Sequence, residues 1–418
     1  MNQLNIRGGG VSWNSRSLQK TWEDSGKSPE LILKKLKEQG ALSFEPYPSG
    51  LFPASVLPAE LLASKMDFVW IRDNCHVAMA LDDVGQIKPA VNVARALLKI
   101  FENERLRLQE IINGTKSIDV KNRPPARVDS TTLKPDYEWA NAQNDSIGDV
   151  LWLVATLAKR ADLTLTDEDK RVLDDIVHYL DAIEYWQDAD NGYWEEARKV
   201  NASSVGTVLA GLIAYRNYFG ESDLLNEMIK KGREALDQIL PNETITPPGL
   251  KRETDAAQIF LVEPLGIVTD EQAEEIVEKC TAQLLRPHGL IRYIGDSYWT
   301  KDYRSLLGLG ERTKDFSENM AERDQMATPD AEAQWTLFDS LLAIYWQKRF
   351  EKSCEEAHRQ RARWHIERSL GQFVDTPDGW RIPEAYFLEG GKWVPNDHVP
   401  LLWTQANVLR MLAFPSPQ

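Results

Sequence analysis

Apolar residues recur at the three-and-four spacing of amphipathic helices through most of the chain from about residue 90 onward. In residues 90–112, for example, Ala94, Leu97, Leu98 and Phe101 fall on one helical face. Strand signals are sparse, so the periodicity predicts an all-α fold. Further helices are expected at about residues 146–161, 168–186, 203–219, 223–240, 255–265, 270–284, 331–349, 352–371 and 403–413.

The expected helices are of two kinds. Residues 205–215 and 337–346 are apolar on more than one face, which requires burial on both sides, whereas residues 352–371 are rich in Lys, Arg and Glu and can face water. This alternation indicates two concentric layers. A count near twelve helices suits an (α/α)6 barrel, a toroid of six helical hairpins. The count includes three more helices, at about residues 30–38, 59–66 and 74–84.

The chain of 418 residues exceeds the usual size of one domain, but a closed architecture that repeats one hairpin can reach this length as one body. No low-complexity linker divides it. We expect the barrel to span residues 61–418. Residues 1–60, whose second half carries several prolines, are expected to pack on the barrel as an extension or lid.

Net charge and cysteine usage exclude several classes of protein. The formal charge of −15 repels phosphate backbones and anionic lipids, so neither nucleic acid nor membrane is an expected partner. Cys75, Cys280 and Cys354 are too scattered for a disulfide framework or a zinc site, and we expect no metal or cofactor. The sequence shows no apolar stretch of a transmembrane helix and no signal peptide at its start, which predicts a cytoplasmic location.

The 14 Trp residues are an unusual enrichment in such a chain. Aromatic rings stack on the apolar C–H faces of sugars while their polar edges bind hydroxyls. Most of these rings should still be core residues, because aromatics are generally buried.

The first polar motif is Trp70-Ile71-Arg72-Asp73-Asn74, directly before an apolar helix. A guanidinium only donates hydrogen bonds and a carboxylate only accepts them, so an adjacent pair can bind two neighbouring sugar hydroxyls. An ion pair beside a helix cap would give the same pattern.

The second and third motifs also precede helices. Asp145 follows Trp139 in a polar run that equally fits a helix cap. Glu195 and Glu196 follow Trp194. Desolvation and mutual repulsion would favour the protonated form of one of these two carboxyl groups, as a general acid requires, although surface Glu-Glu pairs are common.

The fourth motif, residues 289–298, contains Arg292 and Asp296 between aromatic residues, and Trp335 opens the helix that follows. The fifth motif places Glu384 after a proline that fixes the backbone, which suits a carboxylate that activates water, though a plain turn would look the same.

All five motifs lie between helical segments, and in a toroid of hairpins such loops converge at one end. Two separated carboxylates among Arg, Asp and Trp are the layout that glycoside hydrolysis requires. No metal-ligand spacing, phosphate-binding loop or Gly-x-Ser-x-Gly elbow competes with this interpretation.

Together and in this order, the motifs resemble those of family 15 glycoside hydrolases, the glucoamylases and glucodextranases. They resemble even more closely the α and β regulatory subunits of phosphorylase kinase. The likeness covers about residues 65–413. Residues 70–74 resemble the Trp-x-Arg-Asp motif, residues 289–298 resemble the Gly-x-x-Arg-Tyr-x-x-Asp-x-Tyr loop, and residues 201–206 are similar to the Asn-Ala-Ser-Ser-Val-Gly run of the kinase subunits.

The resemblance implies an (α/α)6 barrel in which Glu195 is the general acid and Glu384 the general base. It implies that Arg72, Asp73 and Arg292 bind the non-reducing glucose and that Glu196 is a subsite ligand. The other side chains expected to bind substrate are Trp70, Trp139, Asp145, Trp194, Asp296 and Trp335.

One segment, residues 306–329, departs from the hydrolase pattern, and no starch-binding module is evident. We therefore expect an inverting α-glucosidase that acts on short oligosaccharides, through α-1,4 or α-1,6 linkages, and releases β-glucose. Trehalose-type substrates remain open. The alternative is a non-catalytic, sugar-binding regulatory protein like the kinase subunits, but the presence of both carboxylates favours an enzyme.

Overall fold

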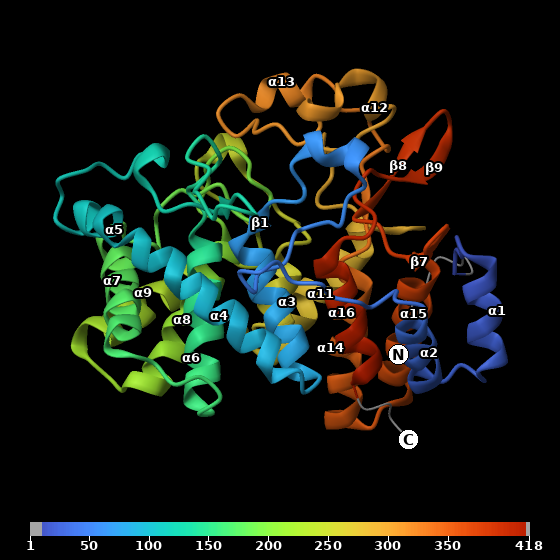
Figure 1. Ribbon diagram of the computed structural model, residues 1–418, viewed down its shortest axis with the longest axis horizontal. Helices are drawn as coiled ribbons and strands as arrows, with labels where there is room; N and C mark the ends of the chain where they lie inside the picture. Colours follow the sequence, from blue (N-terminus) through green and yellow to red (C-terminus); the bar gives the residue numbers. More distant parts are fainter. Residues whose placement is uncertain (1–10, 415–418) are drawn as a thin grey trace.

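The computed structural model describes residues 11–414 and consists mainly of helices that run side by side (Figure 1). Residues 1–10, where the expected N-terminal extension starts, and residues 415–418, where the expected barrel ends, lie outside the described residues.

Six helices form a closed inner ring, because each contacts the next one along the chain and the last contacts the first. In the third of them, every residue from Ala202 to Leu212 is buried, as expected for a helix that is apolar on all sides. The inner helices are α3 (Ile71–Asp83), α6 (Asn144–Lys159), α8 (Ala202–Phe219), α10 (Gln258–Val262), α14 (Phe338–Ser353) and α16 (Leu402–Ala413).

A second helix packs outside each inner helix. These helices are amphipathic; the third of them, for example, buries Leu225, Met228, Gly232 and Leu236 at helical spacing. The two layers confirm the predicted all-α (α/α)6 barrel. In the order of their inner partners, the outer helices are α4 (Ile87–Asn103), α7 (Asp167–Ala182), α9 (Asp223–Ile239), α11 (Asp270–Leu284), α15 (Glu356–Gly371) and α2 (Pro29–Glu38).

The N-terminal segment contributes to the barrel wall, because α2 is the outer partner of the last inner helix, α16. The preceding helix, α1 (Arg16–Asp24), was not predicted; it packs on α15 and buries Trp22. Residues 59–64, expected as an α-helix, form the 3-10 helix η1 (Ala59–Ser64). The expected helix over residues 90–112 is interrupted at Glu104, where α5 (Arg105–Ile112) begins.

Short strands, which the sequence did not predict, join the loops at one end of the barrel (Figure 1). In the largest sheet, Trp335 pairs with Ala385, so the loop before α14 is fixed beside Glu384. This sheet is antiparallel and has the order β3 (Leu285–Arg286), β4 (Gly289–Leu290), β5 (Gln334–Trp335), β8 (Ala385–Glu389), β9 (Lys392–Pro395). Two smaller antiparallel pairs are β1 (Val69–Trp70) with β2 (Arg127–Val128), and β6 (Val374–Thr376) with β7 (Gly379–Arg381).

Several short helices complete the loops. None of the helices between residues 11 and 414 is both long enough and apolar enough to cross a membrane. The short helices are η2 (Val120–Asn122), η3 (Pro248–Leu250), α12 (Tyr303–Leu306), η4 (Leu309–Glu311) and α13 (Met320–Asp324).

Glycines allow the inner helices α6 and α8 to approach closely. A Cβ atom on Gly148 would lie 2.7 Å from the backbone nitrogen and Cα of Val208, and one on Gly211 would overlap the carbonyl oxygen of Gly148. Backbone atoms cannot move away as a flexible side chain can, so either Cβ would push the two helices apart.

Gly148→Ala should therefore lower the free energy of unfolding by about 1–3 kcal/mol, the usual cost of overpacking, although alanine favours helix formation. Urea unfolding followed by far-UV circular dichroism measures this change. The control is Gly310→Ala, where the nearest atom to the new Cβ lies 3.6 Å away. Equal stability of both variants would contradict the close-packing account.

Candidate active site

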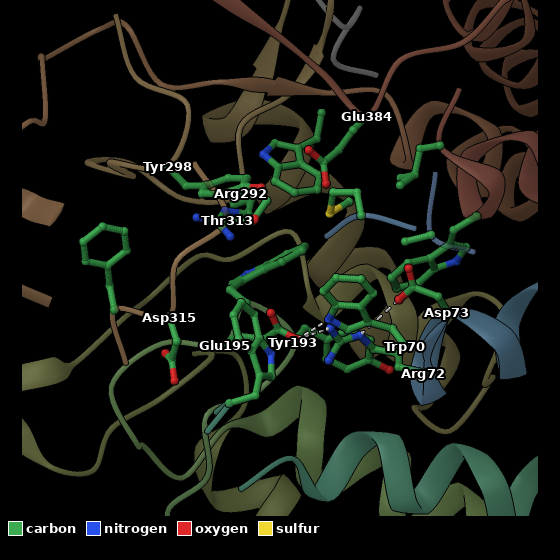
Figure 2. Close-up of a pocket in the computed structure, with 18 of the residues that line it drawn as sticks. Trp70, Arg72, Asp73, Tyr193, Glu195, Arg292, Tyr298, Thr313, Asp315 and Glu384 are labelled. Atoms are coloured by element: carbon green, nitrogen blue, oxygen red, sulfur yellow. Dashed lines mark hydrogen bonds and ion pairs between the residues drawn. The ribbon is translucent and has the colours of Figure 1, made fainter. Parts of the chain in front are cut away.

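A pocket lies at the end of the barrel where loops lead into the inner helices (Figure 2). It encloses about 770 Å³ of space, including the solvent at its open mouth. Most of the predicted site residues line it, and they come from five separate motifs. Those that line it are Trp70, Arg72, Asp73, Trp139, Trp194, Glu195, Arg292, Trp335 and Glu384.

Glu195 lies in a tight loop, closed by the pairing of Asp190 with Lys199. Both Gly192 and Glu195 have positive φ, at 62° and 58°, and for Glu195 this left-handed conformation is uncommon. Strain of this kind persists where surrounding contacts hold it, often at functional sites.

One oxygen of the Glu195 carboxyl group is fixed by three donors. Oε1 accepts hydrogen bonds from Trp70 Nε1 at 2.8 Å, from Gln143 Nε2 at 3.0 Å and from Arg72 Nη2 at 3.5 Å. The other oxygen, Oε2, accepts no hydrogen bond from the residues that the structure describes. This arrangement fixes the carboxyl group and leaves one oxygen available to carry a proton.

Glu384 shows the same arrangement on another wall of the pocket (Figure 2). Its Oε2 lies 2.6 Å from both Asn396 Nδ2 and His398 Nδ1. The contact with an ionised carboxylate requires the His398 proton to be on Nδ1. Among residues 11–414, Oε1 of Glu384 has no donor, so this oxygen is available to accept a proton from water.

Asp73 lies in the first turn of α3 and lines the same pocket. Burial raises its pKa to about 7. The positive charge of Arg72 opposes this shift, whereas the negative charges of Glu195 and Glu384 add to it. No side-chain hydrogen bond within the described part of the chain satisfies this carboxyl group, which leaves it able to bind a hydroxyl.

Arg292 provides a cation for the pocket lining. Its Nε and Nη2 both bond to the carboxylate of Asp296 at 2.6 Å, and the rings of Trp194, Tyr298 and Trp335 surround its guanidinium at about 5 Å. Its Nη1 makes no hydrogen bond with another described residue. A rigid guanidinium with one uncommitted nitrogen can donate to a sugar hydroxyl.

Three residues predicted to bind substrate lie behind the pocket wall instead. Asp145 is fully buried and accepts from Arg72 Nη1 at 2.8 Å, and Asp296 is fully buried against Arg292. Glu196 is also buried and does not line the pocket. All three carboxylates thus contact cations of the pocket lining and do not line the pocket themselves, and their predicted contact with substrate stays a prediction.

Glu196 accepts from Arg323 Nη2 at 2.6 Å and from Arg252 Nη2 at 2.9 Å, and the hydroxyl of Tyr293 also donates to it. Burial opposes its ionisation. The positive charges around it, led by Arg252 and Lys199, nevertheless hold the pKa of Glu196 well below its usual range. Glu196 is thus an ionised carboxylate held by the cations around it.

The sequence analysis missed several lining residues. Trp403 belongs to a motif whose function was not assigned, and Tyr193 lies beside the recognised Trp194. The larger omission is residues 313–316 together with Arg323, which come from the segment that departs from the hydrolase pattern. Long-range contacts place these residues, so their sequence has no periodic pattern from which the placement could be predicted.

Comparison with known families decides what kind of protein carries this pocket. The family description "Glycosyl hydrolases family 15" matches residues 26–299, which is more than half of the chain. The chain belongs to glycoside hydrolase family 15. The family match begins before residue 61, in agreement with the place of α2 in the barrel wall. No curated protein matches the sequence significantly.

Solved structures similar to this family 15 chain share its fold. A glycosidase variant in complex with glucose has a TM-score of 0.64 at 17% identity over 95% of this chain and 97% of its own. A bacterial glucoamylase complexed with acarbose has a TM-score of 0.60 at 16% identity over 94% and 56%, respectively. The glucoamylase from Saccharomycopsis fibuligera has a TM-score of 0.58 at 14% identity over 92% and 95%. At these identities the likeness shows the fold alone.

The raised pKa of Asp73 predicts a pH-dependent loss of stability. In the unfolded chain this carboxyl group ionises near its ordinary pKa of 3.8, but in the folded protein only near 7. The folded state therefore binds more protons in this interval, and the contribution of Asp73 to stability is lost as the pH rises from about 4 to about 7.

Asp73→Asn, which stays neutral, should match the wild type in stability at about pH 4 and exceed it by up to about 4 kcal/mol at about pH 8. Urea unfolding of both proteins at both pH values measures the difference in their free energies of unfolding. The other titrating groups are the same in both proteins, so their effects cancel in this difference. A stability difference that is the same at both values would contradict the proposed burial of the Asp73 charge.

Proposed function

We propose that this chain is an inverting α-glucosidase of the glucoamylase type. It removes the terminal non-reducing α-glucosyl residue from short oligosaccharides with α-1,4 or α-1,6 linkages and releases β-glucose. The observation that carries the proposal is that one pocket holds two carboxyl groups, Glu195 and Glu384, each with one oxygen fixed by donors and one oxygen without a partner among the described residues.

The reaction assigns one role to each free oxygen. Glu195 donates a proton from Oε2 to the glycosidic oxygen, which leaves with the departing sugar as a hydroxyl group. Glu384 accepts a proton at Oε1 from a water molecule, whose oxygen attacks the anomeric carbon from the opposite face. Inverting pairs of this kind stand roughly 6.5–9.5 Å apart, which leaves room for the water.

The remaining lining residues suit a terminal glucose. Asp73 accepts hydrogen bonds from hydroxyl groups, and Arg72 and Arg292 donate them. Trp70, Trp139, Trp194 and Trp335 offer aromatic surface to the C–H faces of the ring. The glucose and acarbose complexes of the two similar proteins support a pocket for this class of ligand.

Replacement of the proposed base separates chemistry from binding. Glu384→Gln keeps the size of the side chain, but its amide cannot accept the proton of water, so kcat should fall by about 10²- to 10⁴-fold. Glucose binding, followed by quenching of tryptophan fluorescence, should change little because the base acts on water. The matched control is Glu389→Gln, at the end of the strand that follows Glu384; Glu389 lies outside the pocket, and the variant should retain activity.

The wild type must first release glucose from a panel of α-glucosides, measured by a coupled glucose assay. If it binds oligosaccharides but releases glucose from none of them, the enzymatic proposal is wrong and a sugar-binding regulatory role replaces it. Full activity of Glu384→Gln would instead overturn only the assignment of the base.

A further inference from the structure

Residues 303–329 form a wall of the pocket that the family motifs did not predict. This segment contains α12, η4 and α13 and lies over the same end of the barrel as β8 and β9 (Figure 1). It contributes to the pocket lining the side chains of Thr313, Lys314, Asp315, Phe316 and Arg323.

Two sets of contacts hold this wall in place. Arg323 donates from Nη2 to Glu196 and from Nε to Ser297 Oγ at 2.9 Å. The Thr313 hydroxyl donates to the carbonyl oxygen of Ser64, where η4 packs on η1. Because Glu196 directly follows Glu195, the first contact fixes the wall relative to the proposed catalytic acid.

Asp315 is the carboxylate of this wall. Its Oδ1 accepts from the backbone nitrogen of Ser317 at 2.7 Å, and its Oδ2 has no partner among the described residues. In Figure 2, Asp315 lies next to Glu195. An imaginary line from Glu195 to Glu384 would pass between Asp315 and Asp73. A half-buried carboxylate, with one oxygen that has no partner among the described residues, thus lines the pocket next to Glu195.

Electrostatic effects agree with this placement. Burial raises the pKa of Asp315; hydrogen bonds from Ser317 oppose the shift, and the negative charge of Glu195 adds to it. The positive charge of Arg127 opposes the shift as well. Asp315 therefore lies within electrostatic reach of Glu195.

The reaction determines which group binds on each side of the pocket. A general acid protonates the oxygen of the departing group, so that group lies on the side of the acid, while the attacking water lies with the base. An ionised carboxylate accepts hydrogen bonds and donates none, so it recognises hydroxyl groups.

We propose that Asp315 is a specificity-determining residue that accepts a hydrogen bond from a hydroxyl group of the leaving sugar. This inference rests on the proposed α-glucosidase function and deepens it: the preferred substrates are glucosides whose leaving group is itself a sugar, not an aryl or alkyl alcohol. The wall formed by residues 313–316 supplies this recognition through a segment that the family motifs do not define.

The test compares two leaving groups in the full-length enzyme. The substrates are the best disaccharide of the panel and 4-nitrophenyl α-glucoside, whose leaving group has no further hydroxyl to bind. Asp315→Ala should lower kcat/KM for the disaccharide by about 10- to 100-fold, the range expected for a hydrogen bond to a charged group. The same variant should change kcat/KM for the aryl glucoside by less than about threefold.

Two further variants secure the interpretation. Asp315→Asn keeps an amide oxygen that accepts a hydrogen bond, so it should lose less disaccharide activity than the alanine variant. Glu318→Gln removes an exposed negative charge from the same segment, outside the pocket lining, and should leave both substrates unaffected.

If Asp315→Ala lowers kcat/KM equally for both substrates, Asp315 supports the structure of the pocket, and the inference is wrong. An unchanged kcat/KM for the disaccharide would also overturn the inference. If the wild type hydrolyses neither substrate nor any other α-glucoside, the proposed function itself fails, and the inference fails with it.

Discussion

Arg72 lies buried at the floor of the pocket between the carboxylates of Asp145 and Glu195. A guanidinium removed from water requires such partners, because an unpaired buried charge is strongly destabilising. Arg72 lies in the first turn of α3, Asp145 lies in the first turn of α6, and Glu195 lies in the loop before α8, so one cation connects the N-terminal ends of the first two inner helices with the loop that leads into the third. The placement of the Glu195 carboxyl group depends on these contacts.

Two other cations of the pocket lining are also paired with buried carboxylates. Behind Arg292 lies the buried carboxylate of Asp296, and behind Arg323 lies that of Glu196. Each pair holds a cation of the pocket lining, and within the described part of the chain the Nη1 of Arg292 and of Arg323 makes no hydrogen bond. The carboxyl groups that do line the pocket, in contrast, keep an oxygen without a partner among the described residues, and this difference distinguishes the carboxyl groups proposed to act on the substrate from those that hold cations.

The sequence predicted the barrel because its helices are long and periodic, and it predicted much of the pocket because the motifs precede inner helices. The residues alone did not distinguish Glu195 from Glu196, and only the family resemblance did, since their different surroundings depend on a left-handed backbone at Glu195 and on Arg323, far along the chain. Two-residue strands have no periodicity to detect. The pairing of α2 with α16 joins the two ends of the chain, which local patterns do not report.

The central claim is that Glu195 and Glu384 act on opposite faces of the glycosidic bond. Proton NMR of the anomeric signals during the first minutes of α-glucoside hydrolysis tests it most directly. Displacement by a water molecule activated at Glu384 predicts that β-glucose appears first and that α-glucose grows in later by mutarotation. Initial release of α-glucose would contradict the proposed pairing of acid and base.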